Sequence, residues 1–305
     1  MKIVTKIIEK LEKKAMPGIG AAFPSVIQTR KSSDSTVKLL LELADGCRIE
    51  AVIITFHRRH TVCLSTQVGC AMGCRFCRTG RLGLTRSLTA AEIVAQYLTC
   101  YQWIINDKQI RHIPKPNIVL MGEGEPLHNF DNIRKSLEIF LSRDGICLGP
   151  RQITLSTVGY LPGLTRIAEL PSINIALSLH SAIPSKREEL IPLEKTSGLG
   201  DIIPILQAIP LKNNQYINFE YLLIAGFNNF TEDAEALHEL TGRFKAIVNI
   251  IPYNTIDGLD WRSPLDEEIN AFRDMLVDRD IRTMVRVSKG RDIEAACGQL
   301  KGSII

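Results

Sequence analysis

The chain has 305 residues, of which 45% are hydrophobic, and it carries a net charge of +4. A chain of this length can bury a full-sized core, so we expect one catalytic domain, residues 58–305, after a short N-terminal extension, residues 1–57. No run approaches the roughly 18 apolar residues that span a bilayer. The N-terminal segment also lacks the apolar block of a signal peptide. These features predict a cytoplasmic protein with no membrane partner.

The chain contains eight cysteines, and we do not interpret it as a protein held together by disulfide bonds. In a reducing compartment they are not expected to form a permanent disulfide framework, so clustered cysteines indicate metal binding or catalysis. We interpret the isolated Cys47, Cys100 and Cys147 as structural residues.

The first elements expected are two apolar runs, 37–43 and 48–56, that flank an Asp-Gly dipeptide typical of a hairpin turn. A further strand is expected over 61–67, followed by a cysteine-rich loop and by a helix that begins near Thr89. The sequence therefore predicts a small N-terminal β-hairpin ahead of the catalytic domain.

From residue 117 onward, strand-like apolar runs alternate with amphipathic helical stretches. The strands are expected at 117–121, 152–156, 173–179, 217–224, 248–251 and 281–287, with helices that include 129–141, 231–242 and 264–278. Six or seven such strands in series predict an α/β fold whose parallel sheet curls into a partial (β/α)6 barrel. Ligands in these folds gather at the carboxyl ends of the strands.

The loop after the first expected barrel strand has the form CxxxCxxC, with Cys70, Cys74 and Cys77. Three thiolates suit an iron–sulfur cluster and leave one iron without a protein ligand, free to chelate a methionine-derived cofactor. A structural zinc ion is the alternative, and its fourth ligand would be Cys63 or His60.

An aromatic residue, Phe76, precedes the last cysteine, and in this the loop resembles the radical-SAM signature. Other motifs follow in order, namely CLSTQVGC from Cys63, MGEGEP from Met121, ITLST from Ile153, ALSLH from Ala176, IPYN from Ile251 and AACGQL from Ala295. Together they resemble the RlmN/Cfr group of 23S rRNA adenine methyltransferases over about residues 32–302, with a shortened N-terminus. The resemblance implies a barrel of the radical-SAM type, a [4Fe-4S] cluster on Cys70, Cys74 and Cys77, and S-adenosyl-L-methionine as cofactor.

The resemblance also implies a set of cofactor contacts at the strand ends. They are Gly124, Glu125, Ser156, Ser178, Leu179, His180 and Asn254. Glu125 would meet the methionine ammonium, the two serines the carboxylate or ribose, and Asn254 the adenine or ribose. The alternatives are that these are turn residues and that His180 is an interior histidine.

Three further residues match catalytic positions of the family. The resemblance implies that Cys297 carries a methyl group received from one cofactor molecule, and that a 5′-deoxyadenosyl radical from a second takes hydrogen from that methyl. The carbon radical would then add to adenine, Glu50 would remove the ring proton, and Cys63 would release the product by forming a transient disulfide with Cys297. Without the family resemblance, we would interpret Cys297 as a buried apolar residue and Glu50 as a solvated strand residue.

The expected partners are RNA, either rRNA or tRNA, and an external reductant such as flavodoxin or ferredoxin, and the protein is expected to be a monomer. The basic residues that could meet phosphates are Arg58, Arg59, His60, Arg75, Arg78, Arg81, Arg86, Arg286 and Lys289. We expect methylation at adenine carbon 2. The alternatives are carbon 8, a tRNA, a small molecule or peptide, and a cluster or zinc protein that only binds RNA.

Overall fold

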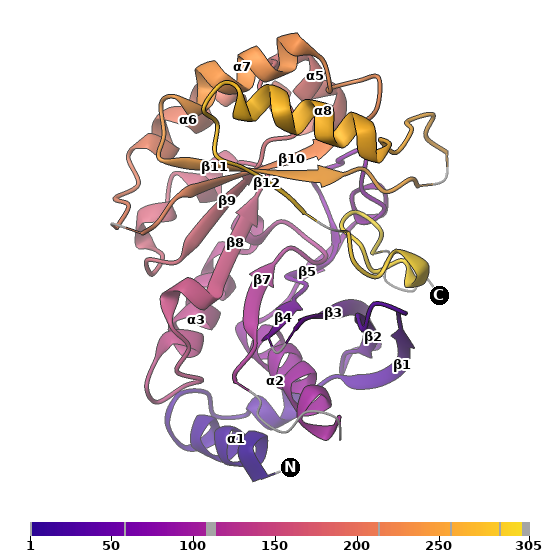
Figure 1. The fold of residues 1–305 in the computed structure, drawn as a ribbon. Coiled ribbons are helices and arrows are strands. Elements are labelled where there is room, and N and C mark those ends of the chain that lie inside the picture. Colours follow the sequence, from indigo (N-terminus) through magenta and orange to yellow (C-terminus); the bar gives the residue numbers. More distant parts are fainter. Residues whose placement is uncertain are drawn as a thin grey trace.

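The computed structural model describes residues 2–57, 59–107, 114–212, 214–256, 258–286 and 288–300. One ten-stranded sheet, in the order β1-β2-β3-β4-β7-β8-β9-β10-β11-β12, forms the framework of this part of the chain (Figure 1). Its strands are β1 (Ser25–Lys31), β2 (Val37–Glu42), β3 (Arg48–Phe56), β4 (Arg59–Cys63), β7 (Asn117–Leu120), β8 (Ile153–Thr157), β9 (Asn174–Ser178), β10 (Ile217–Leu223), β11 (Ala246–Pro252) and β12 (Thr283–Val285).

From β4 to β12 all neighbouring strands are parallel, and the chain crosses from each to the next through helical connections. The α-helices are α1 (Lys2–Lys14), α2 (Ala90–Asn106), α3 (Phe130–Leu141), α4 (Leu161–Leu164), α5 (Pro184–Leu190), α6 (Leu199–Gln207), α7 (Thr231–Thr241) and α8 (Asp266–Val277). The main apolar core lies between these helices and the strands. The predicted partial barrel of parallel strands is confirmed, and each predicted strand lies within a few residues of its expected place, although residue 287 lies outside the described residues.

The predicted strand 61–67 is wrong in one respect, because it is split into two strands. β4 ends at Cys63, and β5 (Gln67–Cys70) leaves the main sheet to pair with β6 (Gly83–Ser87). Ser65 lies at the break, where its Oγ donates to the carbonyl of Glu50 and accepts from the amide of Glu123. This polar anchor turns the chain away from the sheet and sends the cysteine loop across the strand ends.

The predicted hairpin is present, with Gly46 at φ 82 in the turn between β2 and β3. It extends the barrel sheet directly, because β3 pairs with β4 and β1 adds an unpredicted edge strand with every residue exposed. The proposed division at residue 57 therefore falls between two paired strands and stays a prediction. α1 was not predicted, although its lysines and isoleucines separate onto two helix faces, which is the periodicity of an amphipathic helix.

The helix expected near Thr89 begins there, since Thr89 caps α2 and forms a reciprocal capping box with Glu92. Cys100 is buried in this helix, whereas Cys147 is exposed, contrary to its interpretation as a structural residue. None of the helices in the described residues is long and apolar enough to cross a membrane.

Candidate active site

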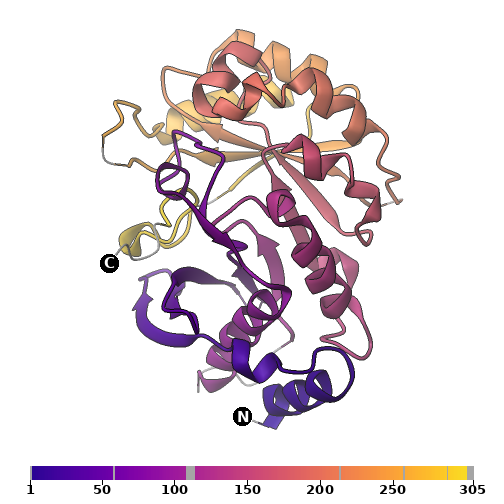
Figure 2. The same ribbon diagram turned by 180° about the vertical axis from the view of Figure 1, so that it is seen from behind.

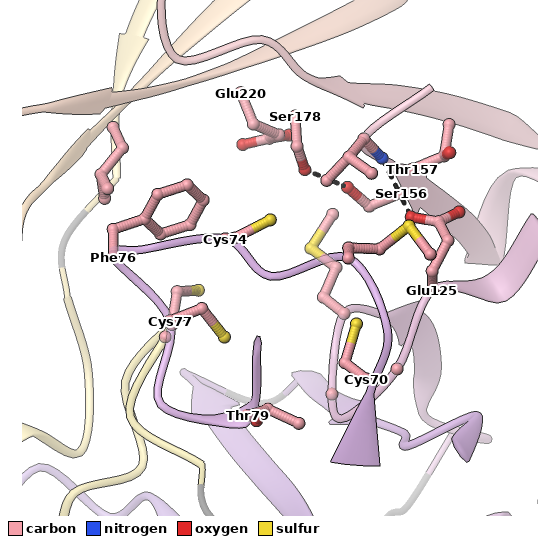
Figure 3. Close-up of a pocket in the computed structure, with 18 of the residues that line it drawn as sticks. Cys70, Cys74, Phe76, Cys77, Thr79, Glu125, Ser156, Thr157, Ser178 and Glu220 are labelled. Carbon is pink, nitrogen blue, oxygen red and sulfur yellow. Dashed lines mark hydrogen bonds between the residues drawn. The ribbon is translucent and has the colours of Figure 1, made fainter. Parts of the chain in front are cut away.

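Cys70 ends β5, Cys74 and Cys77 lie on the loop that follows it, and all three line one pocket at the carboxyl ends of the barrel strands (Figure 3). Cys77 N donates to the carbonyl of Cys74, which closes the loop into a tight turn. Arg75 N donates to the carbonyl of Leu190 and ties the loop to the end of α5. The loop geometry therefore presents the three thiols to the same space.

The donor set suits an iron–sulfur cluster. Burial raises the pKa of all three thiols, that of Cys70 to about 12, so cationic iron is what would favour their thiolate forms. In the described residues, no three His, Cys, Asp or Glu side chains converge closely enough to hold a single metal ion. The proposed zinc ligand His60 instead has its Nδ1 3.1 Å from Thr55 Oγ1. His60 is thus already engaged by Thr55, and the identity of the metal group stays a prediction.

Gly124 and Glu125 follow β7 and line the same pocket as the three cysteines. Gly124 has φ +96, and a Cβ there would lie 2.5 Å from Gln67 Cβ, so only glycine fits. The Glu125 carboxylate accepts hydrogen bonds from the amides of Leu127 and Val158, each at 3.0 Å. Burial raises its pKa to about 7 in spite of these bonds. These bonds fix the carboxylate in the pocket, and a ligand cation beside it would favour its charged form.

Ser156 and Ser178 stand side by side at the ends of β8 and β9, with their Oγ atoms 3.2 Å apart (Figure 3). His180 lines the same pocket and packs edge-on against Phe76, with ring centroids 4.7 Å apart. Its Nδ1 accepts from the amide of Leu222 at 3.1 Å, and burial lowers its pKa to about 3. The ring is therefore neutral, with its proton on Nε2 as a hydrogen-bond donor.

Two of the predicted cofactor residues are not among those that line the pocket. The Leu179 side chain is fully buried in the core. Asn254 is also buried, and its Nδ2 donates to the carbonyl of Cys297 at 3.5 Å. Within the described residues its Oδ1 has no hydrogen-bond partner. Their cofactor contacts stay predictions, and Asn254 has an additional contact with the cysteine segment.

The three predicted catalytic residues come together through the sheet and the C-terminal segment. Cys63 on β4 is directly opposite Val52 on β3, and Glu50 is two residues from Val52 on the same face. Ile293, Ala295 and Leu300 pack on this face, and the yellow C-terminal segment lies beside the indigo strands in both views (Figures 1 and 2).

Cys297 lines the pocket, and the neighbouring Gly298 carbonyl accepts from the amide of Arg78 at 2.8 Å. Cys297 has accessible surface on the pocket wall, yet the protein around it raises its pKa to about 11. Burial raises the pKa of Cys63 well above its usual range, and the nearby Cys297 thiol raises it further. Both are free cysteines in the structure.

Sequence reasoning missed two charged residues at this site. Glu220 on β10 lines the pocket, and its Oε1 accepts from Asn249 Nδ2 at 2.9 Å. Arg187 on α5 is fully buried behind the pocket, paired with Glu194, and donates to the carbonyls of Leu179 and Val158. An acid inside a largely apolar strand was the available signal for Glu220, whereas nothing local distinguishes Arg187 on its short helix.

The basic residues expected to meet RNA differ in their surroundings. Arg59, Arg75, Arg81 and Arg286 are exposed. Arg86 is paired with Asp45 and Glu92, Arg78 with Glu294, and Lys289 Nζ donates to main-chain carbonyls. His60 is buried, and Arg58 lies outside the described residues. The exposed arginines are thus the members of this set that solvent, and therefore a phosphate, can reach, although Arg75 also pairs with Glu189 and stacks on Trp261.

A parallel partial barrel with a three-cysteine loop across its strand ends defines a radical-SAM enzyme. No protein-family model matches the chain. It is 42% identical to a probable dual-specificity RNA methyltransferase RlmN from Akkermansia muciniphila, over 91% of this chain and 78% of that one. It is also 42% identical to the dual-specificity RNA methyltransferase RlmN from Pelobacter propionicus, over 89% of this chain and 76% of that one.

Among solved structures, a radical SAM methyltransferase from Sphaerobacter thermophilus matches with a TM-score of 0.87 and 36% sequence identity. The match covers 98% of this chain and 86% of that one. The chain therefore belongs to the RlmN/Cfr family of radical-SAM methyltransferases.

Proposed function

We propose that this enzyme transfers a methyl group, carried on Cys297, to carbon 2 of an adenine in 23S rRNA. The names of its relatives support RNA as the substrate class. The observation that carries the proposal is the position of Cys297, which lines the pocket of the three loop cysteines while its own segment packs on Cys63. A protein that only binds RNA has no need of this arrangement.

The residues of the pocket form two groups, one that would hold the cluster and one that would bind S-adenosylmethionine. Cys70, Cys74 and Cys77 would hold the [4Fe-4S] cluster, which together with S-adenosylmethionine supplies a 5′-deoxyadenosyl radical when reduced. In the same pocket, Glu125 offers a fixed carboxylate to the methionine ammonium, while the paired serines and His180 offer hydroxyl and N–H groups to the carboxylate or ribose. The neutral His180 avoids a second cation beside the sulfonium.

Cys297 and Cys63 would act in sequence. Because burial raises its pKa to about 11, Cys297 is a thiol at neutral pH and must lose its proton to accept the first methyl group. Once its methyl carbon, as a radical, has added to the adenine, the adduct would lose one electron to a one-electron acceptor, such as the oxidised iron–sulfur cluster that the loop cysteines would hold, and Glu50 would remove the ring proton. Cys63 then attacks the Cys297 sulfur, so that an S–S bond forms and the C–S bond breaks. The released carbon keeps the electron pair and takes a proton, and an external reductant restores the two thiols.

The RNA must present its target adenine outside a stacked helix, because the pocket lies at the strand ends behind the cysteine loop. Because the relatives are named dual-specificity enzymes, we propose a tRNA as the second substrate. Exposed Arg75 and Arg81 at the cysteine loop would contact phosphates.

Mass spectrometry of nucleosides from purified rRNA and tRNA tests the proposal. Cells lacking the gene should lose 2-methyladenosine from 23S rRNA and from tRNA, and a plasmid copy should restore it. A Cys297→Ala copy should not. Loss of 8-methyladenosine instead would show that the carbon assignment is wrong, and unchanged RNA would point to a small-molecule substrate.

A further inference from the structure

Lys38 on β2 is a buried cation beside the proposed base. Its Nζ lies 2.9 Å from Glu50 Oε1, and the side chains of the two residues are 4% and 7% exposed. Removing a lysine and a glutamate from water is costly, and a single ion pair seldom repays that cost. A buried pair at a reaction centre therefore suggests a role other than stability.

The same ammonium holds the segment that leads to Cys297. Lys38 Nζ donates to the carbonyl of Glu294 at 3.0 Å, three residues before that cysteine. Glu294 has φ 54, an uncommon conformation for this residue type, and its carboxylate pairs with Arg78 after the cysteine loop. One side chain thus bridges the proposed base and the backbone that places the methyl carrier.

The strand register explains why Lys38 can reach both groups. Lys38 is directly opposite Val52, and Val52 is directly opposite Cys63, so the three lie in one row across β2, β3 and β4. Side chains in such a row project from the same face. Glu50 is two residues from Val52 on β3, so it lies diagonally across from Lys38 on that face. Ala295 packs on the same face, against Val52 and Cys63.

We propose that Lys38 is a positioning residue that locks the Glu50 carboxylate to the Cys297 segment. This inference rests on the proposed function. If Lys38 joins the two groups, Glu50 and the Cys297 sulfur belong to one rigid unit. The ring proton of the adduct then faces Glu50 at the step in which that proton is removed. Without the ammonium, the adduct forms but its proton is removed slowly.

Lys38→Met keeps most of the side-chain length and removes the charge. The test uses the full chain with its cluster reconstituted anaerobically, S-adenosylmethionine and in-vitro-transcribed 23S rRNA. We expect product release to slow by about a hundredfold, as for a misplaced catalytic group, while the KM for RNA stays unchanged. The trapped protein–RNA adduct should rise relative to released product. A merely structural role would lower adduct and product together.

Three variants complete the design. Lys186→Met is the matched control, because Lys186 also pairs with a buried acid, Asp233, but lies on α5 away from this site. Lys186→Met should leave the ratio of trapped protein–RNA adduct to released product unchanged. Lys38→Arg should recover part of the release rate. If Lys38→Met does not fold, as judged by its melting temperature, Lys38→Gln takes its place.

The inference and the proposed function fail differently. If Glu50→Gln traps the adduct but folded Lys38→Met releases product at the wild-type rate, Lys38 has no positioning role. If Glu50→Gln itself releases product normally, Glu50 is not the base, and the proposed function fails at that step.

Discussion

The side-chain amide of Asn254 donates to the main-chain carbonyl of Cys297, so a residue after β11 holds the C-terminal segment against the pocket. The other end of that amide, Oδ1, is buried without a partner in the described residues. A buried acceptor of this kind is costly unless a ligand satisfies it. Asn254 is thus placed to link cofactor binding to the position of Cys297.

Asn254→Leu keeps the volume and removes both polar atoms. We expect the methylated fraction of Cys297, measured by peptide mass spectrometry, to fall about threefold to tenfold, the range for a lost hydrogen bond. The iron content should not change. Asn270→Leu, at an exposed position on α8, is the control. Equal Cys297 methylation in both variants would remove Asn254 from this role.

The loop cysteines give a second prediction. Replacing Cys70, Cys74 or Cys77 by Ala should abolish both the binding of about four irons per chain and the reductive cleavage of S-adenosylmethionine. Exposed Cys147→Ala should retain both. Iron analysis and chromatographic detection of 5′-deoxyadenosine check the two results. A loop variant that still produced 5′-deoxyadenosine would contradict the cluster assignment.

The order in which Cys297 and Cys63 act gives a third prediction. Cys63→Ala should allow Cys297 to be methylated and joined to RNA but not released, so a protein–RNA crosslink accumulates on denaturing gels. Cys297→Ala should form none. In oxidised wild-type enzyme the two Cα atoms should come within roughly 4.4–6.8 Å, the range of a disulfide. Normal turnover by Cys63→Ala would exclude the resolving role.

Many features of this fold and site can be predicted from local sequence patterns. The alternation of apolar runs and amphipathic stretches predicts the barrel strands, because each βα unit carries its own periodicity, and the spacing of Cys70, Cys74 and Cys77 lies within one loop. Tertiary context decides the rest. The split after Cys63 depends on the bonds of Ser65 to Glu50 on β3 and to Glu123 after β7, and Lys38 acquires its importance only when the sheet brings Glu50 beside it.

Arg187 supports the ends of β8 and β9, because its guanidinium donates to the carbonyls of Val158 and Leu179 while pairing with Glu194. Arg187→Leu leaves that acid buried and alone, and should lower the free energy of unfolding by about 3–5 kcal/mol. The double variant Arg187→Leu, Glu194→Leu should recover part of the loss. Urea denaturation of the cluster-free chain measures both. Arg166→Leu, at a half-buried surface position, should change stability far less, and a double variant no better than the single would contradict the buried-pair explanation.

His180 gives the last prediction, which concerns pH. Burial lowers its folded-state pKa from 6.5 to about 3, so between these values the unfolded chain binds the extra proton and the folded chain does not. Stability from this group is therefore complete above about pH 6.5 and is lost as the pH falls toward 3, at most by about 1.4 kcal/mol per pH unit. His180→Asn is the test variant, because asparagine tolerates the φ of 60 at this position and does not titrate. Denaturation of the cluster-free proteins between pH 6.5 and 4 should show the steeper loss in the wild type, and equal slopes would mean that the ring takes up its proton in the folded state as easily as in the unfolded chain.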